Sequence, residues 1–145
     1  MITYYRGEQM DNKTINIAAV TDDGVTISQH FGRARFYEVL FVENGKIVKR
    51  EHREKLGHNN YAQEEHNHQS GEQHGLDKHS HSKHVSMAEA IKDCKILLAR
   101  GMGAGAYQSM LQVNIKPVVT DIKNIDEAVQ AVINGSIIDH TEKLH

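Results

Sequence analysis

The sequence of 145 residues has a single cysteine, no long apolar run and no excess of charge. The one cysteine, Cys94, excludes an internal disulfide bond. No apolar run approaches the roughly 20 residues of a membrane span, and no charged leader with an apolar centre precedes the first apolar stretch. The formal net charge of -2 gives no electrostatic reason to bind nucleic acid or a membrane. We therefore expect a cytoplasmic protein whose partners are selected by specific sites.

The apolar residues that could form a core are unevenly distributed along the chain. Residues 52–86 contribute only Leu56, Tyr61, Ala62, Leu76 and Val85, whereas the remainder has the apolar content of an ordinary globular domain. Residues 1–14 are mostly polar and lack periodicity. The sequence predicts a flexible tail over 1–14 and one domain over 15–140, interrupted by a disordered loop at 55–84.

Hydrophobic periodicity and turn signals predict alternating strands and helices in the order β-β-β-α-β-α-β-α. Asn44-Gly45 lies between two strand-like runs and favours a tight hairpin turn. Ser86 and Glu89 form a capping-box pattern, and Cys94 falls on the apolar stripe of the helix that would follow. The expected strands are residues 15–21, 36–43, 46–54, 95–100 and 116–121, and the expected helices follow Ser86, the glycines at 101–105 and Asn124, the last ending at Gly135.

This order predicts an α/β fold with a mixed sheet covered by helices on its faces. If the first and fourth strands are neighbours, the chain leaves that pair in opposite directions. Such a switch point creates a crevice beyond the carboxyl ends of the strands, where folds of this class bind ligands. The loops at 21–36, 100–107 and 120–124 would line it.

The stretch "RGMGAGAY" at residues 100–107 places Gly101, Gly103 and Gly105 where a strand gives way to a helix. Backbone N–H groups at a helix N-terminus attract anions, so a bare turn could cradle one. The alternative is that the glycines only permit a tight turn and close packing. The spacing is not G-x-G-x-x-G, and no Lys-Ser or Lys-Thr follows, so nucleotide binding is disfavoured.

Several stretches resemble the dinitrogenase iron-molybdenum cofactor biosynthesis proteins. They are "IAAVTDDGVTISQHFGRARFYEV", "NGKIV", "DCKILLARGMGAGAYQSM", "IKPVVTD" and "IDEAVQAVINGSI", which together span nearly all of residues 15–138 outside the loop. The resemblance implies a single three-layer domain with a five-stranded sheet and ribonuclease H-like topology. It also implies a non-enzymatic carrier that binds anionic iron–sulfur or molybdenum-containing cofactors, bound in part by a histidine, and exchanges them with donor and acceptor proteins. Such a carrier could be a monomer or a homodimer.

The resemblance favours His30, in "SQHFGRA", as a metal ligand, because imidazole binds iron and related metals. Arg33, Arg35 and Arg100 could balance the charge of an anionic cluster, although Arg35 could equally be a solvated surface residue. Cys94 and Met102 could each supply one sulfur, but Cys94 could equally be a small buried hydrophobic residue. A stable iron–sulfur cluster generally needs about four thiolates. The expected cofactor site comprises His30, Arg33, Arg100, Gly101, Met102, Gly103 and Gly105, with Cys94 as a further metal ligand.

Residues 52–84 contain eight histidines in 33 residues. Such clusters bind divalent nickel, cobalt, zinc or iron through changing ligand sets. A metal-ion storage or sensing module is therefore an alternative function, and incidental metal binding by a solvated linker is another. The candidate ligands in this loop are His66, His68, His79, His81 and His84.

Three aspartates, Asp22, Asp23 and Asp121, follow predicted strands near the same crevice. Together with the implied fold, they raise the possibility of two-metal nuclease chemistry. A fold does not establish a function, and turns and caps explain these aspartates equally well. We therefore expect no enzymatic activity.

Overall fold

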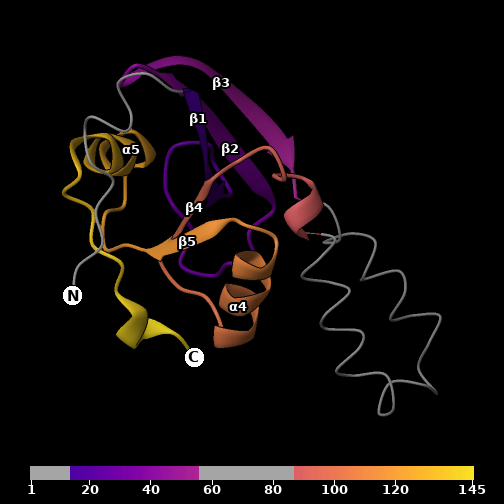
Figure 1. Ribbon diagram of the computed structural model, residues 1–145. Helices are drawn as coiled ribbons and strands as arrows, with labels where there is room; N and C mark the ends of the chain where they lie inside the picture. The colour runs from indigo at the N-terminus through magenta and orange to yellow at the C-terminus, as the bar shows by residue number, and fades with distance from the viewer. Residues whose placement is uncertain (1–13, 56–86) are drawn as a thin grey trace.

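Five strands form one mixed sheet in the computed structural model, which describes residues 14–55 and 87–145 (Figure 1). Their order across the sheet is β3-β2-β1-β4-β5. The strands β3, β2 and β1 pair antiparallel, whereas β1 with β4 and β4 with β5 pair parallel. The first and fourth strands are thus neighbours, which meets the condition stated above for a crevice at their carboxyl ends. The strands are β1 (Thr14–Thr21), β2 (Phe36–Glu43), β3 (Lys46–Glu54), β4 (Ile96–Ala99) and β5 (Lys116–Val119).

Helices cover both faces of this sheet. Helix α5 (Ile125–Asn134) lies on one face, whereas α4 (Ala104–Gln112) and a helical turn at residues 87–89 lie on the other (Figure 1). A short 3-10 helix, η1 (Thr141–Lys143), follows α5. The chain is thus a single α/β domain with ribonuclease H-like topology, as expected. No helix in the described part of the chain has the length and apolarity needed to cross a membrane.

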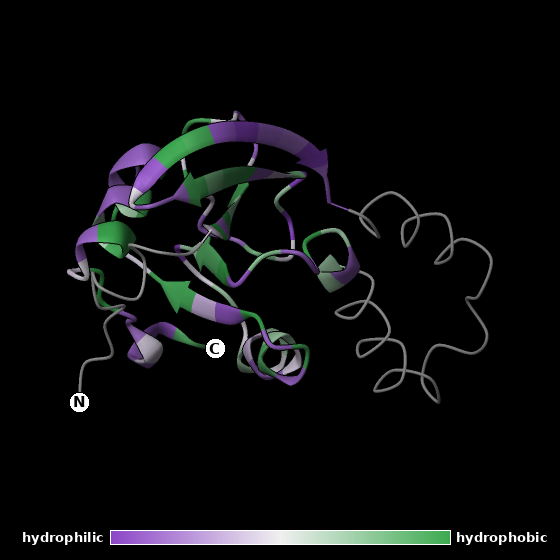
Figure 2. Cartoon of the chain, turned by 45° about the horizontal axis from the view of Figure 1, so that its top comes forward, coloured by the Kyte–Doolittle hydropathy of each residue, from purple (hydrophilic) through white to green (hydrophobic). Residues whose placement is uncertain are grey.

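Buried apolar side chains of the inner strands form the core. Every residue of β4 is buried, and β1 and β2 are buried over most of their length. By contrast, β3 is largely hydrophilic and lies at one edge of the sheet (Figure 2). The edge position suits this strand, since charged side chains protect an edge against aggregation.

The local turn and cap signals are realised at the expected residues. Asn44 and Gly45 adopt positive φ angles of 51° and 80°, as the tight hairpin turn requires. The Asn124 side chain accepts a hydrogen bond from the Glu127 N–H at 2.9 Å and caps α5. Gly135 ends that helix in the left-handed conformation, which a residue without a Cβ adopts at little cost.

The segment after Ser86 differs from the prediction. The helix ends at residue 89, and the chain then makes tight turns in which the Ile91 and Cys94 N–H groups donate to carbonyls three residues earlier. Cys94 is therefore not on a helix, although it is buried as expected. Leu111 of α4 is 39% exposed, whereas Tyr107 and Met110 of the same helix are buried. Residues 1–13 of the predicted tail, the capping residue Ser86 and residues 56–84 of the predicted loop lie outside the described residues. Thr14, which was assigned to the tail, begins β1, and Lys55, which was assigned to the loop, is buried.

Candidate functional site

The His30 loop and the glycine turn contact each other directly at the carboxyl ends of β1 and β4. The Arg100 N–H donates to the Ser28 carbonyl at 3.0 Å, and the Phe31 N–H donates to the Gly101 carbonyl at 3.1 Å. Ser28 also donates to Val20 of β1 at 2.8 Å. These bonds place the loop's own backbone between the ends of the two strands. A ligand at the predicted crevice would therefore contact the outer surface of the two loops.

The position of Gly101 excludes a side chain because the backbone of the His30 loop passes over it. Its φ angle is not in the positive range, and a Cβ at this position would overlap the Gln29 carbonyl oxygen. Gly101 is buried in this contact. The first glycine of the turn therefore permits close packing, which was one of the two interpretations drawn from the sequence.

Gly103 and Gly105 lie at the start of α4, where an anion could be bound. Gly103 is the N-cap residue, and no side chain caps the helix at this position. Gly105, within the first turn of the helix, is exposed. The N–H of Ala104 donates to the main-chain carbonyl of His145 at 2.8 Å. One donor at this helix N-terminus is therefore occupied by the chain itself.

Cationic and imidazole side chains gather along the His30 loop. Within residues 14–55 and 87–145, neither the His30 ring nor the Arg33 guanidinium has a hydrogen bond or an ion pair, and both residues are exposed. Arg100 is half-buried and its Nη1 lies 3.5 Å from the Ile27 carbonyl. The Lys55 ammonium lies 4.7 Å from the centroid of the Phe31 ring. The loop therefore presents unpaired donors beside the glycine turn, where an anion would be attracted.

The two sulfur atoms proposed as ligands are in different surroundings. Met102 is only 1% exposed and belongs to the hydrophobic core. Cys94 is 3% exposed, and its burial raises the pKa of the thiol to about 12, so the metal-binding thiolate is disfavoured. Cys94 also precedes β4, whereas the loop that carries His30 contacts the turn after β4. Six residues of extended chain, roughly 20 Å, separate the two ends, so one metal ion cannot contact both Cys94 and His30.

The three strand-end aspartates are used in local structure. Asp23 Oδ1 accepts from the Thr26 and Val25 N–H groups at 2.7 and 2.8 Å, and these bonds lower the pKa of Asp23 to about 2. Asp22 accepts from the Arg35 N–H at 2.9 Å. Asp121 forms ion pairs with Lys143 and His140. In the described part of the chain no three His, Cys, Asp or Glu side chains are grouped so that they could hold a metal ion.

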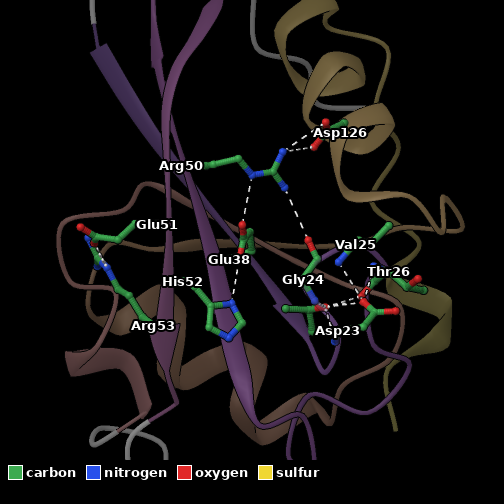
Figure 3. A network of polar contacts seen from close by, with 11 residues as sticks. Asp23, Gly24, Val25, Thr26, Glu38, Arg50, Glu51, His52, Arg53 and Asp126 are labelled. Carbon is green, nitrogen blue, oxygen red and sulfur yellow. Dashed lines mark hydrogen bonds and ion pairs between the residues drawn. The ribbon is translucent and has the colours of Figure 1, made fainter.

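A polar network on the hairpin was not anticipated from the sequence. Glu38, which is almost fully buried, accepts from Arg50 Nε at 3.1 Å and lies 2.9 Å from His52 Nδ1 (Figure 3). Arg50 also reaches Asp126 of α5 at 3.0 Å. The alternation of charges along β3 could have suggested this network, since these side chains share one face of the strand. Every charge in it has a partner, so we assign it to fold stability.

Comparison with known proteins identifies the family. A family model described as "Dinitrogenase iron-molybdenum cofactor" matches residues 13–135. This chain belongs to that family. The match includes both the His30 loop and the glycine turn, so the pair of contacting loops is part of the family domain. Among the curated proteins, none matches this chain.

Solved structures with the same fold are distant in sequence. The crystal structure of PH0822 matches with a TM-score of 0.55 and 21% identity, over 87% of this chain and 96% of the other. The apo form of the orange protein from Desulfovibrio gigas matches with a TM-score of 0.59 and 16% identity, over 87% and 92% of the two chains. At these identities the likeness establishes the fold.

Proposed function

We propose that this protein is a non-enzymatic carrier that binds an anionic iron–sulfur or iron–molybdenum type cofactor on the surface formed by the His30 loop and the glycine turn. The observation that supports this most directly is the presence of His30 and Arg33, both without a partner among the described residues, beside backbone donors in a member of this family. Imidazole supplies one metal bond, and guanidinium and N–H groups balance the negative charge.

The arrangement favours release over permanent binding. Permanent clusters are generally held by about four thiolates, and the one thiol of this chain is buried far from His30. A cofactor bound by one imidazole, Arg33, Arg100 and backbone donors would be held only by contacts to the outer surface of the cofactor. We expect such a cofactor to be received from a donor protein and passed to an acceptor.

Anaerobic reconstitution tests this proposal. The protein is incubated with iron and sulfide, with and without molybdate, and is analysed for bound metal and for cluster absorption. The wild type should acquire colour and metal. His30→Ala should retain about a tenth of the affinity or less, with an unchanged melting temperature, because the exposed ring has no structural contact.

The matched control is His52→Ala, which removes an imidazole of the hairpin network, away from the glycine turn. It should bind the cofactor like the wild type. A protein that stays metal-free in every mixture, or equal losses in His30→Ala and His52→Ala, would contradict the carrier proposal.

A second candidate is a metal-ion storage or sensing module, supported by the eight histidines within residues 52–84. Deletion of residues 58–84 separates the two functions and keeps Lys55, which is 2% exposed and belongs to the folded domain. The carrier proposal predicts that cofactor binding survives the deletion. The module predicts the loss of nickel, cobalt and zinc binding measured by calorimetry.

A further inference from the structure

Residues 139–145, which we name the 139–145 strap, cross the end of β5 and reach the glycine turn. The strap begins on the outer edge of β5, where the Val119 N–H donates to Asp139 Oδ1 at 2.9 Å and the His140 N–H donates to the Val119 carbonyl at 2.8 Å. The 3-10 helix η1 then turns the chain toward α4 (Figure 1). The strap therefore links the sheet edge to the proposed cofactor site.

The far end of the strap occupies the N-terminus of α4. The His145 carbonyl accepts from the Ala104 N–H at 2.8 Å, and the His145 N–H donates to the Met102 carbonyl at 3.3 Å. A Cβ on Gly103 would lie 3.4 Å from the same His145 carbonyl oxygen, so the strap passes close to the bare backbone. This main-chain oxygen carries negative charge and takes the position that an anion would take at a helix N-terminus.

A surface ion-pair cluster holds the middle of the strap. Asp121, which follows β5, pairs with Lys143 and lies 3.3 Å from His140 Nε2. The hydrogen bond from Lys143 is the main cause that lowers the pKa of Asp121, and the charge of Arg100 also contributes. Asp121 is thus close enough to Arg100, one of the residues of the proposed site, for their charges to interact. Its side chains are largely exposed, so each ion pair contributes little and can open readily.

We propose that the 139–145 strap is an internal competitor that occupies the α4 N-terminus in the empty protein and is displaced when an anionic cofactor binds. This inference rests on the proposed function, since it concerns the regulation of the same site. The strap accepts the hydrogen bond of the Ala104 N–H until the cofactor binds, and it returns to this position when the cofactor leaves. A carrier with such a strap binds its cargo more weakly than the open site would, and this favours transfer.

Lys143→Ala tests the strap with molybdate as the probe, because charge and displacement predict opposite results. Removing a cation near the site would weaken anion binding if electrostatics alone acted. Releasing the strap should instead tighten molybdate binding about three- to tenfold. This factor corresponds to the free energy of one exposed ion pair and one hydrogen bond. The control is Lys92→Ala, which removes the same charge from an exposed lysine whose ion-pair partner among the described residues is Glu89. It should leave the affinity unchanged.

Deletion of residues 141–145 provides the second variant and keeps Asp139 and His140 on β5. It should tighten molybdate binding at least as much as Lys143→Ala. Without any anion, hydrogen exchange at the Ala104 amide should become faster in both variants and stay unchanged in Lys92→Ala. Equal or weaker binding in the two strap variants, with normal binding by the wild type, overturns the strap and leaves the carrier proposal standing. If all four proteins fail to bind molybdate, the strap proposal is wrong, because it requires an anion site at the α4 N-terminus, and the reconstitution with iron and sulfide decides the carrier proposal separately.

Discussion

The β2–β3 hairpin and the His30 loop both carry several cationic side chains but use them differently. On the hairpin, Arg50 contacts Glu38 and Asp126 at 3.1 and 3.0 Å, and Arg53 contacts Glu51 at 2.6 Å (Figure 3). Arg53 also contacts Asp93 at 2.8 Å. On the loop, His30 and Arg33 have no such partner within the part of the chain that the structure describes.

The difference distinguishes charged side chains that stabilise the fold from charged side chains that are free to bind a ligand. A guanidinium bonded to two carboxylates joins elements of the fold and has little attraction left for a ligand. An exposed guanidinium without a partner contributes almost nothing to stability but can neutralise an incoming anion. The comparison therefore predicts that substitutions on the hairpin change stability and that substitutions on the loop change binding.

The largest expected effect is at Gly101, where the two loops meet. Gly101→Ala places a methyl group on the Gln29 carbonyl oxygen and should lower the free energy of unfolding by about 3 kcal/mol. Gly32→Ala in the facing loop is the control, since a Cβ there meets nothing within 4 Å. It should change stability by less than about 0.5 kcal/mol in chemical denaturation. Equal stability of the two variants would show that the loops are not packed as described.

A smaller change in stability is expected when one arginine of the hairpin, Arg53, and one of the loop, Arg33, are each replaced. Arg53→Ala removes a two-bond contact with Asp93 and a bond to the Ala90 carbonyl, and should destabilise the protein by about 1.5 kcal/mol. Arg33→Ala should change the unfolding free energy by less than about 0.5 kcal/mol and reduce molybdate binding several-fold. Denaturation and calorimetry on both variants measure this. A loss of binding in Arg53→Ala with none in Arg33→Ala would reverse the assignment.

The smallest effect is the acid sensitivity of the turn after β1. Hydrogen bonds from the Thr26 and Val25 N–H groups keep the pKa of Asp23 at about 2, below its usual 3.8. A depressed pKa stabilises the fold above about pH 4, and this contribution is lost as the pH falls toward 2. Asp23 is largely exposed, so the contribution should stay below about 1 kcal/mol.

Asp23→Asn removes the titrating carboxylate. The loss of unfolding free energy between pH 5 and pH 2 should therefore be smaller in the variant than in the wild type, by less than about 1 kcal/mol. Urea denaturation of both proteins across this range measures the slope. Parallel curves for the wild type and the variant would contradict the role of the Asp23 carboxylate.

Sequence patterns predicted the elements whose signals are local. The hairpin depends on Asn44 and Gly45, and α5 depends on the Asn124 cap, an apolar stripe and Gly135, so each was located nearly to the residue. The helix after Ser86 was expected to be longer. Its apolar spacing, from Met87 to Cys94, is also satisfied by tight turns that bury the same side chains.

Features that depend on contacts between distant segments could not be predicted. Gly101 was correctly singled out, but its role depends on the Gln29 carbonyl, 72 positions earlier in the chain. The strap contacts α4 through the main chain of His145, which leaves no trace in side-chain patterns. The distance between Cys94 and His30 likewise follows only from the direction of β4.

The closed edge of β5 has a consequence for self-association. Val119 has both main-chain groups bonded to the strap, and Pro117, two residues before it on the same side of the strand, has no N–H to donate. An incoming strand from another molecule would find almost no hydrogen-bonding partners there. Growth of the sheet by addition of strands is thus blocked at β5. Because the blocking bonds come from Asp139 and His140, this edge stays closed when residues 141–145 leave the α4 N-terminus, and the protein can exchange its cargo without exposing a sheet edge to aggregation.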